Sequence, residues 1–200
     1  MRKAYFGVAM ILAVALLCGS ASAVLVTLKG NGTDGPIDVL PGTTVTIAMF
    51  VGGINAANDS VTDMAGFQGK LVANTTNGTG VFTGVPAASP WVKSLPLPAQ
   101  VMEMATGSDT YAAILYDPSG VTMPSISGNL QDLALFSFRA DSGIVLVSMV
   151  ADDTFLADTF GVIYTDMRLG DALTIRVVPE PATLSLLGIG LLGLLRLHRK

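Results

Sequence analysis

The chain has 200 residues, a formal net charge of −4, one cysteine and one histidine. Cys18 and His198 lie close to the two ends, so residues 24–178 contain neither residue type. This absence excludes a disulfide, an ordinary zinc site, and Ser-His-Asp or Cys-His catalysis in the long middle segment.

The middle segment is also strongly acidic. Residues 24–178 hold 14 acidic and six basic residues, a net charge of −8, and Glu103 is the only glutamate among them. Because binding to phosphates needs the opposite sign of charge, we expect no nucleic-acid partner.

The first 23 residues have the pattern of a secretory signal peptide. Arg2 and Lys3 precede an apolar run at residues 4–17, and Ala21 and Ala23 have the spacing of a signal peptidase site. We therefore expect residues 1–23 to form a signal-peptide helix that directs export through the membrane and is cut off after Ala23.

Residues 24–178 contain short alternating apolar runs separated by Gly, Asn, Asp and Pro, without a long stretch of helical periodicity. This pattern is typical of an all-β sandwich domain of about nine or ten strands. The predicted strands are residues 24–28, 43–51, 64–73, 81–84, 101–106, 111–116, 133–139, 144–150, 161–165 and 173–178.

Turn residues separate several of these strands. Residues 74–80 read Asn-Thr-Thr-Asn-Gly-Thr-Gly and predict a turn, and Asp141-Ser142-Gly143 predicts a hairpin turn. The four prolines in residues 85–99 exclude a central strand there and predict a loop.

The acidic residues are candidates for the two kinds of catalytic site that carboxylates form without histidine or cysteine. Asp141-Ser142-Gly143 matches the D-[ST]-G of aspartic proteases, but those enzymes need two such aspartates, and a turn explains the single copy better. A secreted hydrolase that uses aspartates and Glu103 is a third functional class, but no carboxylate pair is singled out. We therefore expect a protein without catalytic residues.

Two acidic loops suit calcium, because hard cations prefer carboxylate and carbonyl oxygens. The first contains Asn58, Asp59 and Asp63, and the second Asp152, Asp153 and Asp158. Neither has the spacing of an EF-hand, so calcium stays a possible ligand and no cofactor is assigned.

Trp91 lies in the proline-rich segment and has two interpretations. Its ring could stack on a sugar, as aromatic side chains do in carbohydrate sites, or could fill one end of the sandwich core. We favour the core and keep Trp91 as the candidate ligand-binding residue.

The last 22 residues have a three-part order. Pro179-Glu180-Pro181 is followed by an uncharged apolar run at residues 182–195 and by a basic end. A helix over residues 182–197 approaches the length needed to cross a bilayer, and the basic end would stay on the cytoplasmic side. We expect a short transmembrane helix, in preference to a buried core helix.

This order, at the end of an exported chain, resembles the PEP-CTERM sorting signal. In that family an exosortase, a membrane enzyme of Gram-negative bacteria, recognises the tail, and the proteins are associated with exopolysaccharide and biofilm. The resemblance implies that Pro179, Glu180 and Pro181 form a sorting motif in a tail, residues 179–200, that is removed.

The middle segment resembles the cohesin-like domain, which shares a jelly-roll sandwich with a family of cellulose-binding modules. The resemblance lies in residues 41–47, 66–71 and 135–139, and in the Ser142-Gly143 turn that follows. It implies one jelly-roll domain at residues 24–178 and a binding role, since cohesins bind dockerins through one sheet face.

These observations together predict an exported, non-enzymatic protein at the cell surface or in the extracellular matrix, structural or adhesive in exopolysaccharide or biofilm. The alternative is a carbohydrate-binding module that acts on the extracellular polysaccharide. The expected partners are signal peptidase, the exosortase, and a polysaccharide or a surface protein.

Overall fold

A computed structural model of the chain describes residues 24–53, 60–61, 64–95, 101–106, 111–117, 123–127, 130–158, 160–164 and 167–179. Ala21, Ala23 and the predicted transmembrane helix at residues 182–197 lie outside these ranges, so the signal peptide and the membrane segment stay predictions. Within the described ranges no helix has the length and apolar character needed to span a membrane.

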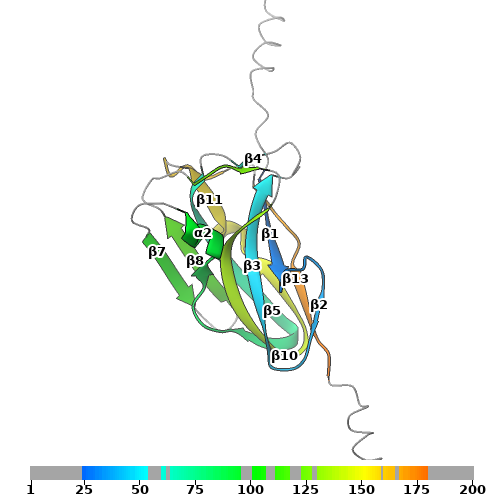
Figure 1. Cartoon of the computed structure of the whole chain (residues 1–200). Helices are drawn as coiled ribbons and strands as arrows, with labels where there is room; N and C mark the ends of the chain where they lie inside the picture. The colour runs from blue at the N-terminus through cyan, green and yellow to red at the C-terminus, as the bar shows by residue number, and fades with distance from the viewer. Residues whose placement is uncertain are drawn as a thin grey trace, which may run out of the picture.

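The described residues are mostly strands (Figure 1). The strands are β1 (Val24–Gly30), β2 (Ile37–Val39), β3 (Thr43–Gly53), β4 (Ser60–Val61), β5 (Met64–Phe82), β6 (Ala87–Ala88), β7 (Val101–Thr106), β8 (Tyr111–Asp117), β9 (Ile126–Ser127), β10 (Gln131–Met149), β11 (Phe155–Asp158), β12 (Met167–Leu169) and β13 (Leu173–Val177). Two short helices join them, α2 (Pro90–Ser94) and the 3-10 helix η1 (Ala151–Asp153).

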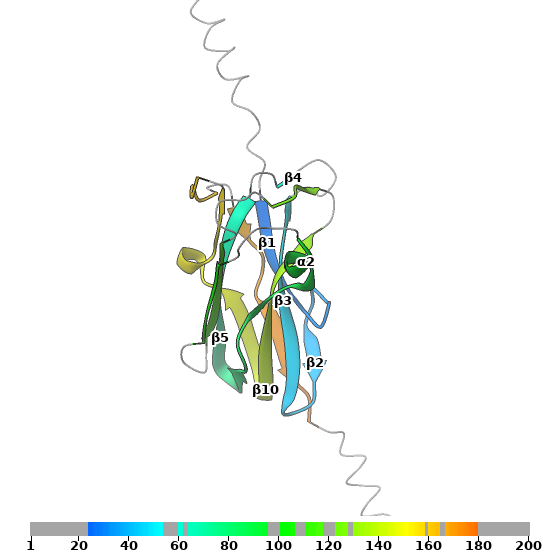
Figure 2. The ribbon, with the colours of Figure 1, turned by 60° about the vertical axis from the view of Figure 1, so that its left-hand side comes forward.

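The strands form two facing layers that are joined by the long strands β5 and β10 (Figure 2). In one layer β3 lies between β1 and the first half of β10, and β12 pairs with β1. In the other layer the second half of β10 lies between β13 and β5, followed by β8 and β7. The predicted β-sandwich is therefore confirmed.

The core lies between the layers and follows the alternation of the sequence. Val45, Ile47, Met49 and Val51 on β3 are fully buried, as their spacing predicts. Gly69 on β5 leaves room for Met49, since a Cβ there would lie 2.6 Å from the methionine sulfur. The two layers thus approach closely at this point, and a larger residue on β5 would require the end of the Met49 side chain to shift.

The predicted hairpin turn at Asp141-Ser142-Gly143 is wrong, because β10 continues through it. Residues 131–140 pair with β3, whereas residues 144–147 pair with β13, so the strand changes layers at these three residues. Register shifts on both sides of Gly143 bend the strand into a corner at the lower end of Figure 1.

The predicted turn at residues 74–80 is also wrong, because β5 bends alongside β10 and stays paired with it. Gly78 lies opposite Gly143, which has a φ of 67°. A Cβ on Gly143 would overlap the carbonyl oxygen of Asn77. The two strands can therefore bend as one ribbon only because glycine occupies both positions.

Three shorter features also differ from the predictions. The predicted strand at residues 161–165 is wrong for its described part, where Ile163 makes only an isolated bridge to Ala157. The proline-rich segment contains helix α2, whose first turn is capped by Ser89, with Pro90 at the first position. The strands of two or three residues, β2 among them, are too short to show a period in the sequence.

Tyr116 gives a test of the core. Its ring stacks on Phe67 at 5.3 Å, and its hydroxyl is buried without a hydrogen-bond partner among the described residues. We expect Tyr116→Phe to raise the free energy of unfolding by about 1 kcal/mol, because an unpaired buried hydroxyl is costly. Urea unfolding measures this, and a loss of stability would show that the hydroxyl has a partner.

Burial also raises the pKa of Tyr116 above its usual 10.0. A raised folded-state pKa means that stability present below pH 10 is lost as the pH rises, since the unfolded chain ionises first. The advantage of Tyr116→Phe should therefore grow above pH 10. A constant difference between the two proteins up to pH 11 would contradict this.

Candidate binding surface

The outward side of the β13–β10–β5–β8 layer carries exposed apolar side chains. Leu146 and Ile144 on β10 are 41% and 45% exposed, and Val72 on β5 lies opposite the half-buried Tyr111 on β8. Lys70 lies one row further along β5, opposite Ala113. We call this set the outer face and define it by Lys70, Val72, Tyr111, Ile144 and Leu146.

The sequence contains a signal for the outer face that strand periodicity alone misses. Residues 144–147 read Ile-Val-Leu-Val, whereas a strand with one wet side alternates apolar and polar residues. Val145 and Val147 fill the core, which leaves Ile144 and Leu146 in water. A continuous apolar run on a half-buried strand therefore indicates an apolar outer surface.

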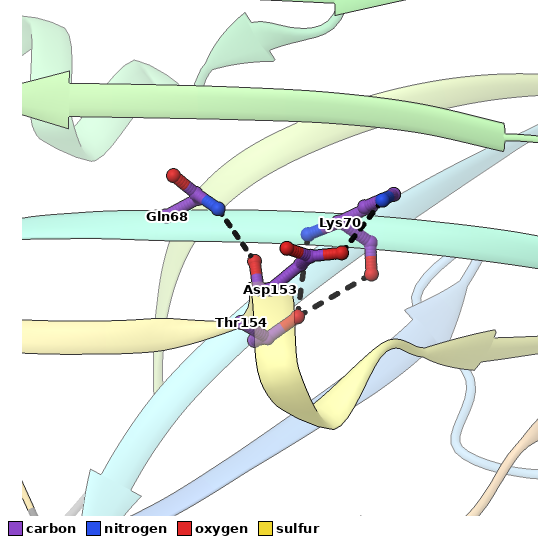
Figure 3. Close-up of polar contacts among 4 residues, drawn as sticks. All are labelled: Gln68, Lys70, Asp153 and Thr154. Atoms are coloured by element: carbon purple, nitrogen blue, oxygen red, sulfur yellow. Dashed lines mark hydrogen bonds and ion pairs between the residues drawn. The ribbon is translucent and has the colours of Figure 1, made fainter. Parts of the chain in front are cut away.

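A hydrogen-bonded clasp supports the outer face at the end where Lys70 lies (Figure 3). Along one edge of β5, the pairing with β11 ends at Gln68 and the pairing with β10 begins at Leu71. Lys70 therefore lies in the gap between the two ladders. Thr154 fills the gap: its Oγ1 accepts from the Lys70 N–H and donates to the Lys70 carbonyl, both at 3.3 Å. Gln68 Nε2 also donates to the Asp153 carbonyl at 3.0 Å.

Lys70 and Asp153 form an ion pair within this clasp. The ammonium nitrogen lies 2.6 Å from Asp153 Oδ2 and 5.4 Å from the centre of the Tyr111 ring. The hydrogen bond to Asp153 raises the pKa of Lys70 above its usual 10.5. The lysine is therefore held protonated, and Asp153 balances its charge within the pair.

The clasp predicts a specific loss of stability on Thr154→Val. Thr154 is 2% exposed, so valine would leave the Lys70 N–H without its partner in a dry place. We expect a loss of about 1–3 kcal/mol in urea unfolding. Thr154→Ser keeps the hydroxyl and should lose less than half as much, and equal losses would mean that the methyl group matters more than the hydrogen bonds.

The structure does not assemble the second predicted calcium site. Asp153 is paired with Lys70, and Asp158 Oδ1 accepts from the backbone N–H groups of Phe160 and Val162. In the described ranges no three acidic, histidine or cysteine side chains come together as a possible metal site. The first calcium candidate, Asn58, Asp59 and Asp63, lies outside those ranges.

Asp158 shapes an exposed apolar tip beyond β11. Phe160 is 88% exposed, followed by Gly161 with a φ of 75° and by Val162, 60% exposed. Asp158 pairs with Met64 at the start of β5, far from the corner of that strand. The tip therefore stands at the upper end of Figure 1 and is separate from the outer face.

Of the other predicted residues, Trp91 lies on α2, is half-buried and packs against the core. Asp141 is paired with Arg139 at 2.9 Å, which raises the pKa of the guanidinium. The carboxylate of Asp141, which matched the protease motif, is thus engaged in an ion pair at the corner of β10. Glu103 lies on edge strand β7, opposite Leu115.

The described part of the chain ends directly after β13. The Val178 N–H donates to the Val39 carbonyl at 2.8 Å, and Pro179, which has no N–H, is exposed. Glu180 and Pro181 lie outside the described residues. The predicted sorting motif therefore starts one residue after the last hydrogen bond found for this strand.

Comparison with protein families locates a motif at this point. The model of the PEP-CTERM protein-sorting motif matches residues 177–200. The predicted motif is therefore confirmed, and it marks an exported protein of a Gram-negative bacterium that passes through a membrane. A search of curated proteins finds no match to this chain.

Solved cohesins have the same fold. The sixth cohesin of scaffoldin B from Acetivibrio cellulolyticus, solved with a mutant Cel5 dockerin, matches with a TM-score of 0.54 and 10% identity over 78% of this chain and 99% of that chain. The second type II cohesin module of the ScaA scaffoldin from the same organism matches with a TM-score of 0.54 and 12% identity, over 80% of this chain and 99% of that chain. A type I cohesin–dockerin complex from Clostridium thermocellum matches with a TM-score of 0.53 and 11% identity, over 78% of this chain and 99% of that chain.

Proposed function

We propose that this protein is a non-enzymatic binding module of the cell surface or extracellular matrix, delivered by its signal peptide and released from its tail by an exosortase. The observation that carries the proposal is the position of the sorting motif, which begins at Val177 inside the last strand of a cohesin-like sandwich. In this proposal the predicted signal peptide and the sorting motif flank one folded domain, and that domain reaches the exterior.

The fold and the outer face support a binding role. Several of the similar cohesins are described in complexes with dockerins, so this sandwich type can hold a protein partner. The outer face offers exposed Ile144 and Leu146 on β10, and the Lys70–Asp153 ion pair lies farther along the same face. Exposed apolar side chains that gather on one sheet face are typical of protein interaction sites. We infer that a matrix or surface protein binds there.

The sequence also supports the absence of catalysis. The middle segment has neither histidine nor cysteine, and Asp141, the best match to a protease motif, is engaged by Arg139. We infer a structural or adhesive role in exopolysaccharide or biofilm, the setting that the sorting motif suggests. Carbohydrate binding through Trp91 is the alternative, although the packing of its ring against the core favours a structural role.

A retention assay tests the binding role. We expect Ile144→Ser with Leu146→Ser, in the full chain made by the producing bacterium, to weaken retention in the extracellular matrix roughly thirtyfold, since about 2 kcal/mol of apolar contact is lost. Val85→Ser is the matched control, because Val85 is 63% exposed and lies outside the outer face. Equal retention of the double variant and the control would refute the proposed face.

Digestion of the matrix identifies the class of partner. Release of the wild-type protein by a protease that leaves the sandwich itself intact supports a protein partner. Release by polysaccharide hydrolases alone, together with loss of retention in Trp91→Ala, would replace the proposal with the carbohydrate-binding alternative.

A further inference from the structure

The lower end of the sandwich carries two exposed apolar side chains beside the exit of the tail. β2 and β13 run parallel, with Val39 opposite Val177, so the next residues, Leu40 and Val178, lie side by side. Leu40 is 50% exposed and Val178 is 44% exposed. We call this pair the exit shoulder. It is an apolar surface at the place where the sorting motif begins.

The exit shoulder is held rigidly. The Thr43 N–H donates to the Leu40 carbonyl at 3.1 Å, and Gly42 has a φ of 77°, which together with Pro41 is the pattern of a type II turn. The Gly42 N–H donates to the Ala140 carbonyl at 2.8 Å. Leu40 is therefore fixed to the corner of β10, and a partner that binds it does not have to order a loop first.

The short segment between the sandwich and the apolar run brings any protein that binds the motif close to this shoulder. Pro179 follows Val178 directly, and the apolar run begins at residue 182. Three extended residues span at most about 11 Å. A protein that encloses Pro179-Glu180-Pro181 must therefore approach the end of the sandwich closely enough to touch Leu40.

The charges at this end favour a protein over a lipid surface. Arg176, the nearest basic residue on β13, is neutralised by Asp38 at 2.7 Å. The domain as a whole has a net charge of −8, which an anionic bilayer repels. The shoulder itself is uncharged and apolar, which suits a dry protein contact.

We propose that the exit shoulder, Leu40 with Val178, is the docking surface for the membrane enzyme that processes the tail, so that this enzyme recognises the folded sandwich as well as the motif. The inference rests on the proposed processing of the tail. It adds that an unfolded or detached tail is a poorer substrate than a tail that is presented by the shoulder.

Pulse labelling in the producing bacterium tests the proposal with the full chain. We expect Leu40→Asp to be processed about tenfold more slowly than wild type, as for the loss of a central interface side chain. Phe160→Asp is the matched control, because Phe160 is exposed at the opposite end of the sandwich and should be processed at the wild-type rate. Equal rates for Leu40→Asp and wild type would overturn the proposal.

A spacer provides a second test that does not depend on Leu40. Ten Gly/Ser residues inserted between Val178 and Pro179 separate the motif from the shoulder, and we expect slower processing. Faster processing would mean that the sandwich only hinders the enzyme, which also overturns the proposal. If the tail of the wild-type chain is never processed, the proposed function itself fails. If the wild type and the variants are processed at equal rates, only the docking proposal fails.

Discussion

Gly143→Ala is expected to destabilise the domain by about 2–5 kcal/mol, a large part of the roughly 5–15 kcal/mol that separates a folded domain from its unfolded chain. Gly143 has a φ of 67°, a backbone region that costs an alanine about 1–2 kcal/mol. The added Cβ would also overlap the Asn77 carbonyl and lie 2.8 Å from the Cα of Gly78, and relieving such overpacking costs about 1–3 kcal/mol more.

The reason for this large effect is the corner. β5 and β10 bend together at this point and carry the chain from one layer to the other, so neither strand can move alone. Gly84→Ala is the matched control, since Gly84 has a φ of 72° but no atom lies within 4 Å of the place that its Cβ would take. Urea unfolding should show a loss of only about 1–2 kcal/mol there. Equal losses at the two glycines would mean that the corner is not tightly packed.

Replacing Pro179-Glu180-Pro181 by three alanines is expected to abolish processing of the tail. These residues lie near the start of the matched region, and a proline biases the residue before it toward extended backbone. Alanines would instead favour a helix that continues upstream from the apolar run. The variant should stay in the membrane fraction with its tail still attached.

The same replacement should leave the sandwich intact. The last hydrogen bond described after β13 runs from the Val178 N–H to Val39, and Pro179 is exposed. We expect the free energy of unfolding to change by less than about 0.5 kcal/mol. Normal processing of the triple variant would show that Pro179-Glu180-Pro181 is not the recognised element.

The sequence predicted the regular parts of the fold and not its corners. The alternation in β3 reports burial directly, because every second side chain enters the core. The segments around Gly78 and Gly143 have the composition of turns. Only the pairing of β5 with β10 shows that both strands continue through them. Local composition cannot distinguish a hairpin from a bend in a paired ribbon, since both need glycine at positive φ.

The candidate surfaces were harder to predict than the sorting motif. A motif is local, and Pro179-Glu180-Pro181 could be read from consecutive residues. The clasp joins Lys70 to Thr154, which are 84 residues apart, and the exit shoulder joins Leu40 to Val178. Such contacts follow from the order of strands in the sheet, which the strand pattern alone does not specify.

The masses of the mature protein's two ends test the central claim most directly. Mass spectrometry of the protein recovered from the surface or matrix of the producing bacterium should give a chain that starts at Val24 and ends before Lys200. A full-length chain from Met1 to Lys200, found in the cytosol, would contradict export, processing and the function that depends on them.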